Sequence, residues 1–500
     1  MLFNSYTFIL LFLPVVLAGY ALIGRLAARR TAMAWLVLAS VIYYGWWNPR
    51  YVGLLLASVL ANYVTGLLLG ASCASRRGRV VLGLGVAANL ALLGYYKYAN
   101  FFVDTASALA GTHWHLEPIV LPLAISFFTF QQIAYLVDAY RGEAREYHLI
   151  DYALFVTFFP QLIAGPIVHH KEMLPQFTEP GPIRLRASDL SVGVTIFTIG
   201  LCKKVLLADE AAAHASPVFA AADALTPIST LEAWVGVLCY AMQIYFDFSG
   251  YSDMAIGAAR LFGIKLPLNF HSPYKAASVA EFWRRWHITL SRFLRDYLYI
   301  PLGGNRKGKL RRYVNLMITM LLGGLWHGAG WTFVAWGALH GIYLCINHGW
   351  AAWLRRRRRD QQRRGTAHHL AACGLTFLAV TVAWVFFRAQ TWQGAAHLLA
   401  AMIGGASSPD ALAVISIKNA LPLLAAMLAV VWLAPNTQQI MADYEPAWDS
   451  SPQTGRVEPG PTAAWLTWRP TPAWAVGIAL AGLTALALLT KYSEFIYYDF

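Results

Sequence analysis

Two histidines in largely apolar sequence are the residues best suited to chemistry. His327 lies in "LLGGLWHGAGW", residues 321–331, and His287 lies in "WRRWHITLS". Because apolar surroundings disfavour an imidazolium, a histidine buried there is held neutral, which is the form required of a general base. For His327 the residues alone leave two roles open, a catalytic base and a satisfied structural histidine.

The glycines and tryptophans around His327 predict how it is held. Glycines precede and follow it, and they allow either the close approach of two helices or a departure from helical geometry. Trp326 and Trp331 would form the wall of a dry, narrow cavity. No Asp or Glu lies within a helical turn of the histidine, so we expect a backbone carbonyl or a water to orient the imidazole.

The composition predicts that membrane helices position these residues. Of the 500 residues, 58% are hydrophobic and 13% are charged, which is about half the charged fraction of a soluble domain. Apolar runs recur along the whole chain, and helices satisfy their own backbone in lipid. We therefore predict an all-α polytopic membrane protein with about ten to twelve transmembrane helices and additional re-entrant or interfacial helices. The short run 313–325 is a candidate for half a span or a re-entrant piece.

Positive charge is clustered, which predicts how the chain is oriented. The net charge is +14, and arginines gather at 25–30, 76–79 and 355–364. Such clusters are typical of cytoplasmic loops; nucleic-acid binding is the weaker interpretation, because no folded basic domain accompanies them. The first apolar run precedes its arginines, so we expect an uncleaved first span with the N-terminus outside, in the periplasm of a bacterium.

The segment 264–310 is the most informative part outside the apolar runs. Ser278 and Glu281 have the spacing of a capping box at the start of a helix. Large apolar residues then follow one face and arginines mainly the other: Phe282, Trp286, Leu290, Phe293 and Tyr297 against Arg284, Arg285, Arg292 and Arg295. We interpret the segment as one amphipathic helix at the membrane surface. Its arginines can anchor acidic lipid headgroups, face an anionic ligand such as a cofactor carrying phosphates, or do both.

Other polar residues in or beside the apolar runs have structural explanations. His287 lies at the edge of the aromatic face of the amphipathic helix, and from this position alone we expect a structural residue. Asp247 and Asp253 do not share a helix face, and we expect each to pair with a neighbouring arginine or to cap a helix. Four polar residues of one run would join helices or line a polar tunnel: Ser126, Thr129, Gln131 and Gln132. The five cysteines lack CxxC or metal-ligand spacing, so we infer neither a disulfide nor a metal.

Beyond these patterns, the sequence resembles the membrane-bound O-acyltransferase family. The resemblance extends from residue 1 to residue 500 and is most specific over 244–341. It is carried by "MLFNSYTFILLFLPVV", "YYGWWNPRY", "SFFTFQQIAYLVDAYRG", "FFPQLIAGPIV", "YFDFSGYSDMAIG", "LPLNFHSPYKAASVAEFWRRWHITLSRFLRDYLYIPLGGNRKG", "LLGGLWHGAGWTFVAWGALHG" and the terminal "FIYYDF".

This resemblance implies a fold and a site. The fold is a ring of tilted helices around a tunnel that opens on both sides of the membrane. His327 matches the catalytic histidine of the family and His287 its second histidine, which reverses the structural interpretation of His287. The basic helix matches a segment near the cytoplasmic end of the tunnel, although no single arginine is assigned as a ligand. One transmembrane domain would occupy 1–500, with peripheral helices in 1–110, a core with the catalytic segment in 118–345 and C-terminal helices in 367–500.

The resemblance also implies a reaction. A cytoplasmic acyl donor, acetyl-CoA, would present its thioester to the tunnel as a substrate, without any permanently bound cofactor. An acceptor hydroxyl would enter from the outer side, and His327 would remove its proton as the oxygen attacks the carbonyl.

The expected acceptor is an exported polysaccharide, alginate before others, modified at the bacterial inner membrane. The chain has no GxSxG motif and no soluble hydrolase-like domain, so the last transfer needs a periplasmic, SGNH-like acetyltransferase partner. Membrane lipids are the other expected partners, and nucleic acid is not one. The alternatives are D-alanyl transfer to teichoic acid, acetylation of cellulose or peptidoglycan, and a transporter that carries an acyl donor without chemistry.

Overall fold

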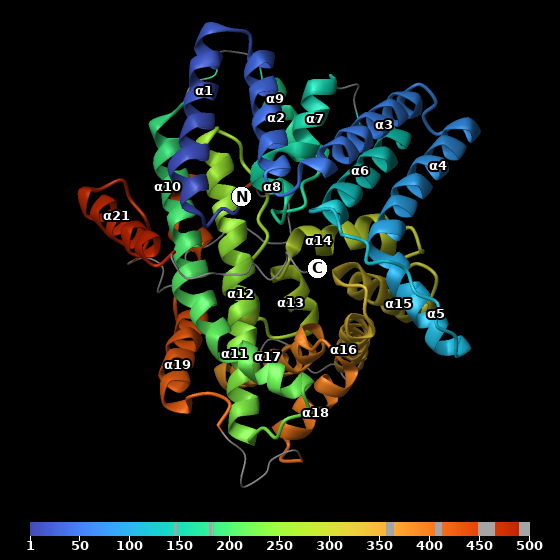
Figure 1. Ribbon diagram of the computed structural model, residues 1–500, viewed down its shortest axis with the longest axis vertical. Helices are drawn as coiled ribbons and strands as arrows, with labels where there is room; N and C mark the ends of the chain where they lie inside the picture. The colour runs from blue at the N-terminus through green and yellow to red at the C-terminus, as the bar shows by residue number, and fades with distance from the viewer. Residues whose placement is uncertain are drawn as a thin grey trace.

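The computed structural model describes residues 1–144, 148–179, 183, 185–356, 365–405, 413–448 and 466–489. Within these ranges every named element is a helix, and the one β-contact is an isolated bridge between Pro267 and Trp448 (Figure 1). The predicted all-α fold class is confirmed. The terminal "FIYYDF" and most of the arginine cluster at 355–364 lie outside the described residues.

The helices divide into those before and those after residue 229. The first group is η1 (Thr7–Phe12), α1 (Leu13–Leu26), α2 (Arg29–Gly45), η2 (Pro49–Tyr51), α3 (Val52–Gly70), α4 (Arg76–Leu93), η3 (Gly94–Tyr98), α5 (Ala99–Ala110), α6 (Ile125–Tyr140), α7 (Leu149–Thr157), α8 (Phe159–Leu162), α9 (His170–Thr178), α10 (Ala187–Cys202), η4 (Lys203–Ala208) and α11 (Asp209–Asp223). The second group is α12 (Thr230–Leu261), η5 (Pro273–Lys275), α13 (Val279–Arg285), α14 (Ile288–Leu294), η6 (Arg295–Tyr299), α15 (Lys309–His327), α16 (Trp331–Arg356), α17 (Thr366–Arg388), α18 (Trp392–Met402), α19 (Ile417–Leu433), α20 (Thr437–Ile440), η8 (Ala442–Tyr444) and α21 (Pro472–Ala487).

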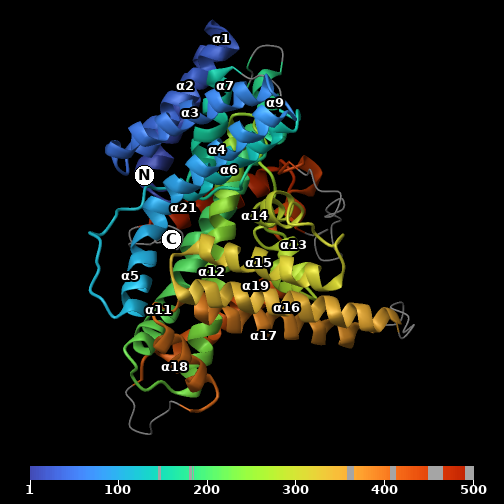
Figure 2. The ribbon, with the colours of Figure 1, turned by 90° about the vertical axis from the view of Figure 1, so that its right-hand side faces the viewer.

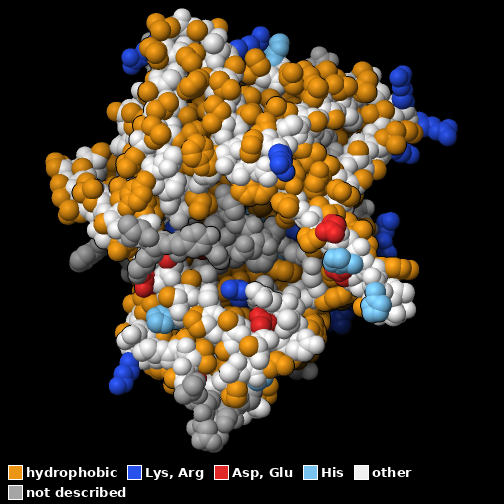
Figure 3. All heavy atoms as spheres, viewed as in Figure 1, with side chains coloured by type: hydrophobic (Ala, Val, Ile, Leu, Met, Phe, Trp, Pro, Cys, Tyr) orange, Lys and Arg blue, Asp and Glu red, His pale blue; other side chains and the backbone are white. Residues whose placement is uncertain are grey.

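Several of these helices are suited to cross a membrane. By length and composition, 5 helical segments of the described chain are long and apolar enough: Thr7–Leu26, Pro49–Gly70, Arg76–Ala110, Ala187–Asp223 and Thr366–Arg388. Apolar side chains also cover much of the face seen in Figure 3, where charged side chains are few. A surface of this kind is stable against lipid rather than water. The predicted number of spans and the predicted tunnel stay predictions.

Helix α12 runs through the middle of the molecule and is buried along nearly its whole length (Figures 1 and 2). It packs on α10 with the two backbones in contact. A Cβ atom added at Gly257 would lie 2.5 Å from the backbone nitrogen of Phe197, and one at Gly250 would lie 2.7 Å from the carbonyl oxygen of Gly200. Glycines at a crossing let two membrane helices approach this closely.

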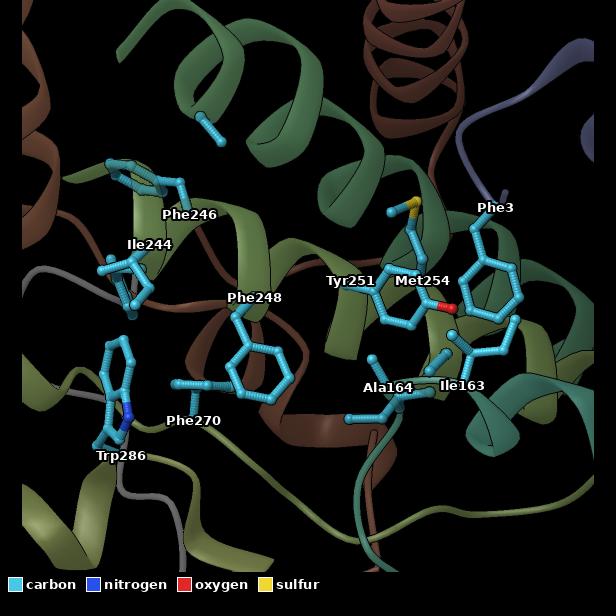
Figure 4. Close-up of a cluster of buried hydrophobic side chains, with 14 of the residues drawn as sticks. Phe3, Ile163, Ala164, Ile244, Phe246, Phe248, Tyr251, Met254, Phe270 and Trp286 are labelled. Atoms are coloured by element: carbon cyan, nitrogen blue, oxygen red, sulfur yellow. The ribbon is translucent and has the colours of Figure 1, made fainter. Parts of the chain in front are cut away.

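Aromatic side chains from α12 build the core next to the later segments. Figure 4 shows Phe248 and Tyr251 of α12 pointing to opposite ends of this cluster, toward Phe270 and Phe3 respectively. The ring centroids of Phe248 and Phe270 are 4.9 Å apart, and those of Phe3 and Tyr251 are 4.7 Å apart. The N-terminal residues and the segment after α12 are therefore held against the same central helix.

Asp247 and Asp253 of α12 form ion pairs, as expected, but their partners are lysines rather than arginines. Lys204 Nζ lies 2.8 Å from Asp247 Oδ1 and 2.8 Å from Asp209 Oδ1, and Lys203 Nζ lies 2.6 Å from Asp253 Oδ2. Both lysines come from η4, where the helix widens to a π-helical turn. This wider turn presents two successive lysines to α12, a feature that helical spacing in the sequence does not reveal.

The polar residues of α6 join helices, which was one of the two expected roles. Gln131 Nε2 donates to the carbonyl of Phe155 at 3.0 Å, and Gln132 Nε2 donates to the Ser58 hydroxyl at 3.0 Å. Helix α15 contains the apolar run 313–325, which belongs to a helix of 19 residues that ends at His327. Its place as half a span or a re-entrant piece stays a prediction.

Candidate active site

The segment predicted as one amphipathic helix is broken at His287. Helix α13 ends at Arg285, Trp286 is extended, and His287 has a φ of 42° before α14 begins. A residue other than glycine in this left-handed region costs about 1–3 kcal/mol, a strain that the surrounding structure must hold in place. Such strained residues occur often at functional sites.

Asn269, on the segment that follows α12, holds the break open. Its backbone carbonyl accepts the N–H of Ile288 at 3.0 Å, and its side-chain oxygen accepts the hydroxyl of Thr289 at 2.9 Å. These bonds replace contacts that a continuous helix would make within itself. The prediction of a single helix was wrong for this reason, although Ser278 caps α13 as expected by accepting the N–H of Glu281 at 3.2 Å.

The same amide fixes which nitrogen of His287 carries the proton. Nδ1 of His287 lies 3.1 Å from Oδ1 of Asn269, and because this oxygen can only accept, Nδ1 donates. Nε2 of the neutral ring then carries a lone pair. Nε2 is buried and has no hydrogen-bond partner among the described residues. His287 therefore offers a basic nitrogen to the interior of the protein.

His327 is the last residue of α15 and is 3% exposed. Aromatic rings surround it, with centroids 5.0 Å away for Trp326, 5.0 Å for Trp336 and 5.2 Å for Phe387. Trp326 therefore packs beside the imidazole as expected, but Trp331 does not, because it is 57% exposed. The other neighbouring rings come from α16 and α17 instead.

Glycines set the distance between α15 and α16, as expected. A Cβ atom added at Gly324 would lie 2.3 Å from the carbonyl oxygen of Phe333, and one at Gly337 would lie 2.3 Å from the carbonyl oxygen of Met320. Because these contacts are to backbone atoms, a side chain could enter only if the helices moved apart. The glycines thus bring α16 against the helix that carries His327.

The structure brings the two predicted histidines together. The ring centroids of His287 and His327 are 6.4 Å apart, and the planes are at 60°. A third buried histidine, His340 of α16, lies behind them, and its Nδ1 accepts the indole N–H of Trp283 at 3.3 Å. We call these three imidazoles and the aromatic rings around them the histidine chamber. Apolar surroundings keep the imidazoles neutral, and a neutral imidazole can accept a proton from a reacting group.

The arginines of the basic segment are largely committed within the protein. Arg285 lies 2.6 Å from Glu281, Arg292 lies 2.6 Å from Glu172, and Arg295 lies 2.7 Å from Asp296. Arg284 is exposed. These ion pairs engage three of the four arginines, and both expected roles of the basic face, lipid anchoring and anion binding, stay predictions.

A second polar cluster lies at the far end of a line of stacked rings that starts beside His327. Trp326, Phe130, Phe293 and Tyr297 follow one another at centroid distances of 5.3, 4.2 and 5.1 Å. The hydroxyl of Tyr297 then donates to Asp138 Oδ2 at 2.7 Å. The cluster is therefore connected to the histidine chamber by packed side chains.

His169 and His170 complete this cluster, and with Asp138 they place three possible metal-ligand atoms within 4.8 Å of one another. The hydrogen bonds favour another arrangement. The N–H of Lys171 donates to Nδ1 of His169 at 3.3 Å, so Nε2 carries the proton and donates to Asp138 Oδ2 at 2.6 Å. Burial lowers the pKa of His170 to about 4, so this ring is neutral at pH 7.

Sequence patterns did not single out three groups of this region. Lys97 lies beside the backbone of His327, and its signal was an ionisable residue at the end of an apolar run. Asn269 precedes His287 by 18 positions and has no local signal. The paired histidines at 169 and 170 are a signal that spacing alone leaves ambiguous.

A comparison of the sequence with protein families identifies the class of this protein. The sequence profile described as "MBOAT, membrane-bound O-acyltransferase family" matches residues 137–379, which contain both histidines. The chain belongs to this family of multi-pass membrane proteins.

Three named relatives are similar to this chain over much of its length. The chain is 45% identical over 430 residues to the peptidoglycan O-acetyltransferase of Helicobacter pylori, an alignment that covers 81% of this chain and 80% of the relative. It is 44% identical over 410 residues to the "Probable alginate O-acetylase" of Pseudomonas putida, with 80% of each chain covered. The teichoic acid D-alanyltransferase of Streptococcus thermophilus is 31% identical over 255 residues, which is 49% of this chain and 60% of the relative.

Proposed function

We propose that this O-acyltransferase passes acetyl groups from cytoplasmic acetyl-CoA to an exported polysaccharide, and that His327 and His287 handle the proton. The observation that carries this proposal is the pair of buried imidazoles with ring centroids 6.4 Å apart. Two neutral rings in a chamber walled by aromatic side chains suit a reaction in which one proton must leave a hydroxyl.

In the proposed step, His327 removes the proton of an acceptor hydroxyl while the oxygen attacks the thioester carbonyl. A carbon–oxygen bond forms, the carbon–sulfur bond breaks, and the proton is returned to the departing thiolate, so that CoA leaves as the thiol. The Nε2 lone pair of His287 can accept this proton after it leaves the hydroxyl and before it is returned to the thiolate. Asn269 keeps that lone pair on Nε2 by occupying Nδ1.

We propose alginate as the first candidate acceptor, on the resemblance of the opening "MLFNSYTF" and the closing "FIYYDF" to the alginate-acetylating branch. Peptidoglycan is the second candidate, because one relative named for that activity has 45% identity. We propose further that the chain works in the inner membrane with its N-terminus in the periplasm. A periplasmic SGNH-like acetyltransferase would complete the transfer, since the chain has no GxSxG motif.

The test is to replace each histidine in the native host and to measure ester-linked acetate on alginate and on peptidoglycan. His327→Ala should abolish acetylation of one polymer while the variant stays in the membrane at normal abundance. His287→Asn, which tolerates the left-handed backbone, should reduce it strongly. Wild-type acetylation by His327→Ala would overturn the catalytic assignment. If deletion of the gene leaves the acetate content of both alginate and peptidoglycan unchanged, the proposed substrate class is wrong.

A further inference from the structure

A buried lysine lies against the backbone of His327. Lys97 belongs to η3, the π-helical turn between α4 and α5, and its ammonium lies 2.5 Å from the carbonyl oxygen of Trp326 and 3.2 Å from that of His327. The Ser126 hydroxyl is 3.4 Å away, and the centre of the Trp326 ring is 5.8 Å away. A cation in such a place is costly unless carbonyls and a ring face replace its water.

These contacts cap the C-terminal end of α15. The last carbonyls of a helix lack partners within the helix and carry partial negative charge, so a cation or a hydroxyl there is stabilising. The next residue of η3 acts in the same way, since the hydroxyl of Tyr98 donates to the carbonyl of Leu325 at 2.9 Å. Lys97 and Tyr98, two successive residues of one turn, thus donate hydrogen bonds to the last three carbonyls of α15, which end at His327.

The helix itself holds this end weakly. The bond from Gly328 N to the carbonyl of Gly324 is 3.4 Å long, and the chain leaves the helix immediately afterwards. With glycine at 328, the backbone after His327 has few constraints of its own. The contacts from η3 therefore restrain the end of the helix that carries the imidazole.

Lys97 also lines a cavity of about 860 Å³ that borders this end of the helix. The turn Gly328–Gly330 forms one side of the cavity, and Asn100, Asp104 and Trp331 are among its other lining residues. Figure 2 shows α5, which bears part of this lining, next to the start of α16 at one edge of the molecule. The end of α15 consequently separates an open cavity from the closed histidine chamber.

We propose that Lys97 is a positioning residue for the acyl transfer: it fixes the end of α15 and so places the His327 imidazole. Tyr98 contributes to the same restraint through its hydrogen bond to the carbonyl of Leu325. The inference rests on the proposed function of His327. The ammonium contacts the carbonyls of Trp326 and His327 and the Ser126 hydroxyl, none of which is a reacting group. Its loss therefore releases the end of α15 without removing a group that takes part in the chemistry. Turnover falls, while the binding of the acyl donor stays unchanged.

The test compares purified Lys97→Met, Lys97→Arg and Tyr98→Phe with the wild type in lipid nanodiscs. With the proposed periplasmic partner and acceptor oligosaccharide present, initial rates of CoA release from acetyl-CoA give kcat and the KM for acetyl-CoA. We expect Lys97→Met to lower kcat about 10- to 100-fold, as small misplacements of catalytic groups do, with an unchanged KM. Arginine should restore most of the rate, and Tyr98→Phe should have a smaller effect in the same direction.

Lys275 supplies the matched control. Its ammonium caps another helix, with Nζ 2.9 Å from the carbonyl of Ala434 at the end of α19. Lys275→Met therefore removes the same chemistry from a helix end that does not carry His327. It should leave kcat unchanged, and the melting temperatures of both methionine variants report any general loss of folding.

The outcomes separate the two proposals. If wild type and His327→Ala transfer acetate equally, the proposed function fails. If His327→Ala is inactive but Lys97→Met has wild-type kcat, the positioning role fails. An increase in KM without a fall in kcat would overturn it as well. If Lys97→Met does not fold, kcat of Lys97→Arg and Tyr98→Phe tests the positioning role. A lysine that only stabilises the fold predicts wild-type kcat in both variants, whereas a positioning lysine predicts a lower kcat in Tyr98→Phe.

Discussion

Two regions of the molecule bury polar side chains in apolar surroundings, and they do so in opposite ways. Along α12, Asp247 and Asp253 are ionised groups matched by lysines at 2.8 and 2.6 Å. In the histidine chamber, His287 and His327 are neutral rings, and their neighbours are aromatic. In the first region, ion pairs hold helices together. The second leaves uncharged nitrogen atoms that can take a proton, which is what a catalytic base requires.

The contrast predicts that the loss of a histidine side chain from the chamber lowers activity but not stability, whereas the loss of a lysine from the ion pairs lowers stability. His327→Ala should lower acetyl transfer by about 10²- to 10⁴-fold, the usual contribution of a general base, and leave the melting temperature nearly unchanged. Rates per folded molecule and thermal unfolding in the same detergent measure both quantities. A large drop in melting temperature would place His327 among the structural groups instead.

The ion pairs of α12 should show the reverse. Lys204→Met leaves two carboxylates without their shared cation, and breaking a buried pair from one side costs about 3–5 kcal/mol. We expect a much lower melting temperature but normal turnover per folded molecule. The control is Lys265→Met, which removes a more exposed pair with Glu445 and should cost at most about 1 kcal/mol. Equal losses in both variants would contradict the argument.

The cluster at the far end of the ring stack tests whether a buried imidazole can be purely structural. His170 faces His169, Asp138, Lys171 and the backbone of Glu143, and burial lowers its pKa from 6.5 to about 4. The unfolded chain takes up the proton first, so stability is full above pH 6.5, falls between pH 6.5 and 4, and levels off below. The loss is roughly 3 kcal/mol.

The measurement is the melting temperature of wild type and His170→Gln from pH 7.5 to 4. The variant should lose most of the dependence on pH in this window. His113→Gln, at an exposed position, should keep it. An unchanged slope in His170→Gln would mean that other groups dominate acid unfolding.

The smallest effect concerns the orientation of His287. Asn269→Ala removes the acceptor of the Nδ1 proton, and leaving that donor unpaired costs about 1–2 kcal/mol, or roughly tenfold in turnover. Thr289→Val removes another donor to the same oxygen and leaves the histidine bond intact. Turnover of the threonine variant should therefore stay near wild type. If Thr289→Val loses as much turnover as Asn269→Ala, Asn269 acts by holding the backbone and not by orienting the His287 ring.

The sequence predicted those features that depend on local pattern. Apolar runs indicated helices, the glycines around His327 indicated close packing, and the family resemblance paired His287 with His327, which lie together in the structure. The break at His287 was not predictable, because Phe282 to Tyr297 keep helical spacing through it. The bonds that cause the break come from Asn269, which approaches only in the folded chain.

The sequence also did not predict which residues distant in the chain pair with one another. Acidic residues in α12 required cations, but the sequence offered many arginines and the structure uses two lysines of a π-helical turn. Lys97 likewise reaches His327 across 230 positions of sequence. Local periodicity contains no information about which distant element supplies such a group.

The contact between Gly324 and Phe333 has a consequence for how this protein can vary. Most core distances depend on side chains, so they drift as neutral substitutions accumulate. Here the backbone of α16 itself fills the space where a Cβ atom would stand, 2.3 Å away. The separation of the two helices beside the His327 ring is thus a fixed dimension of the main chain. A side chain larger than hydrogen at position 324 would require α15 and α16 to move apart.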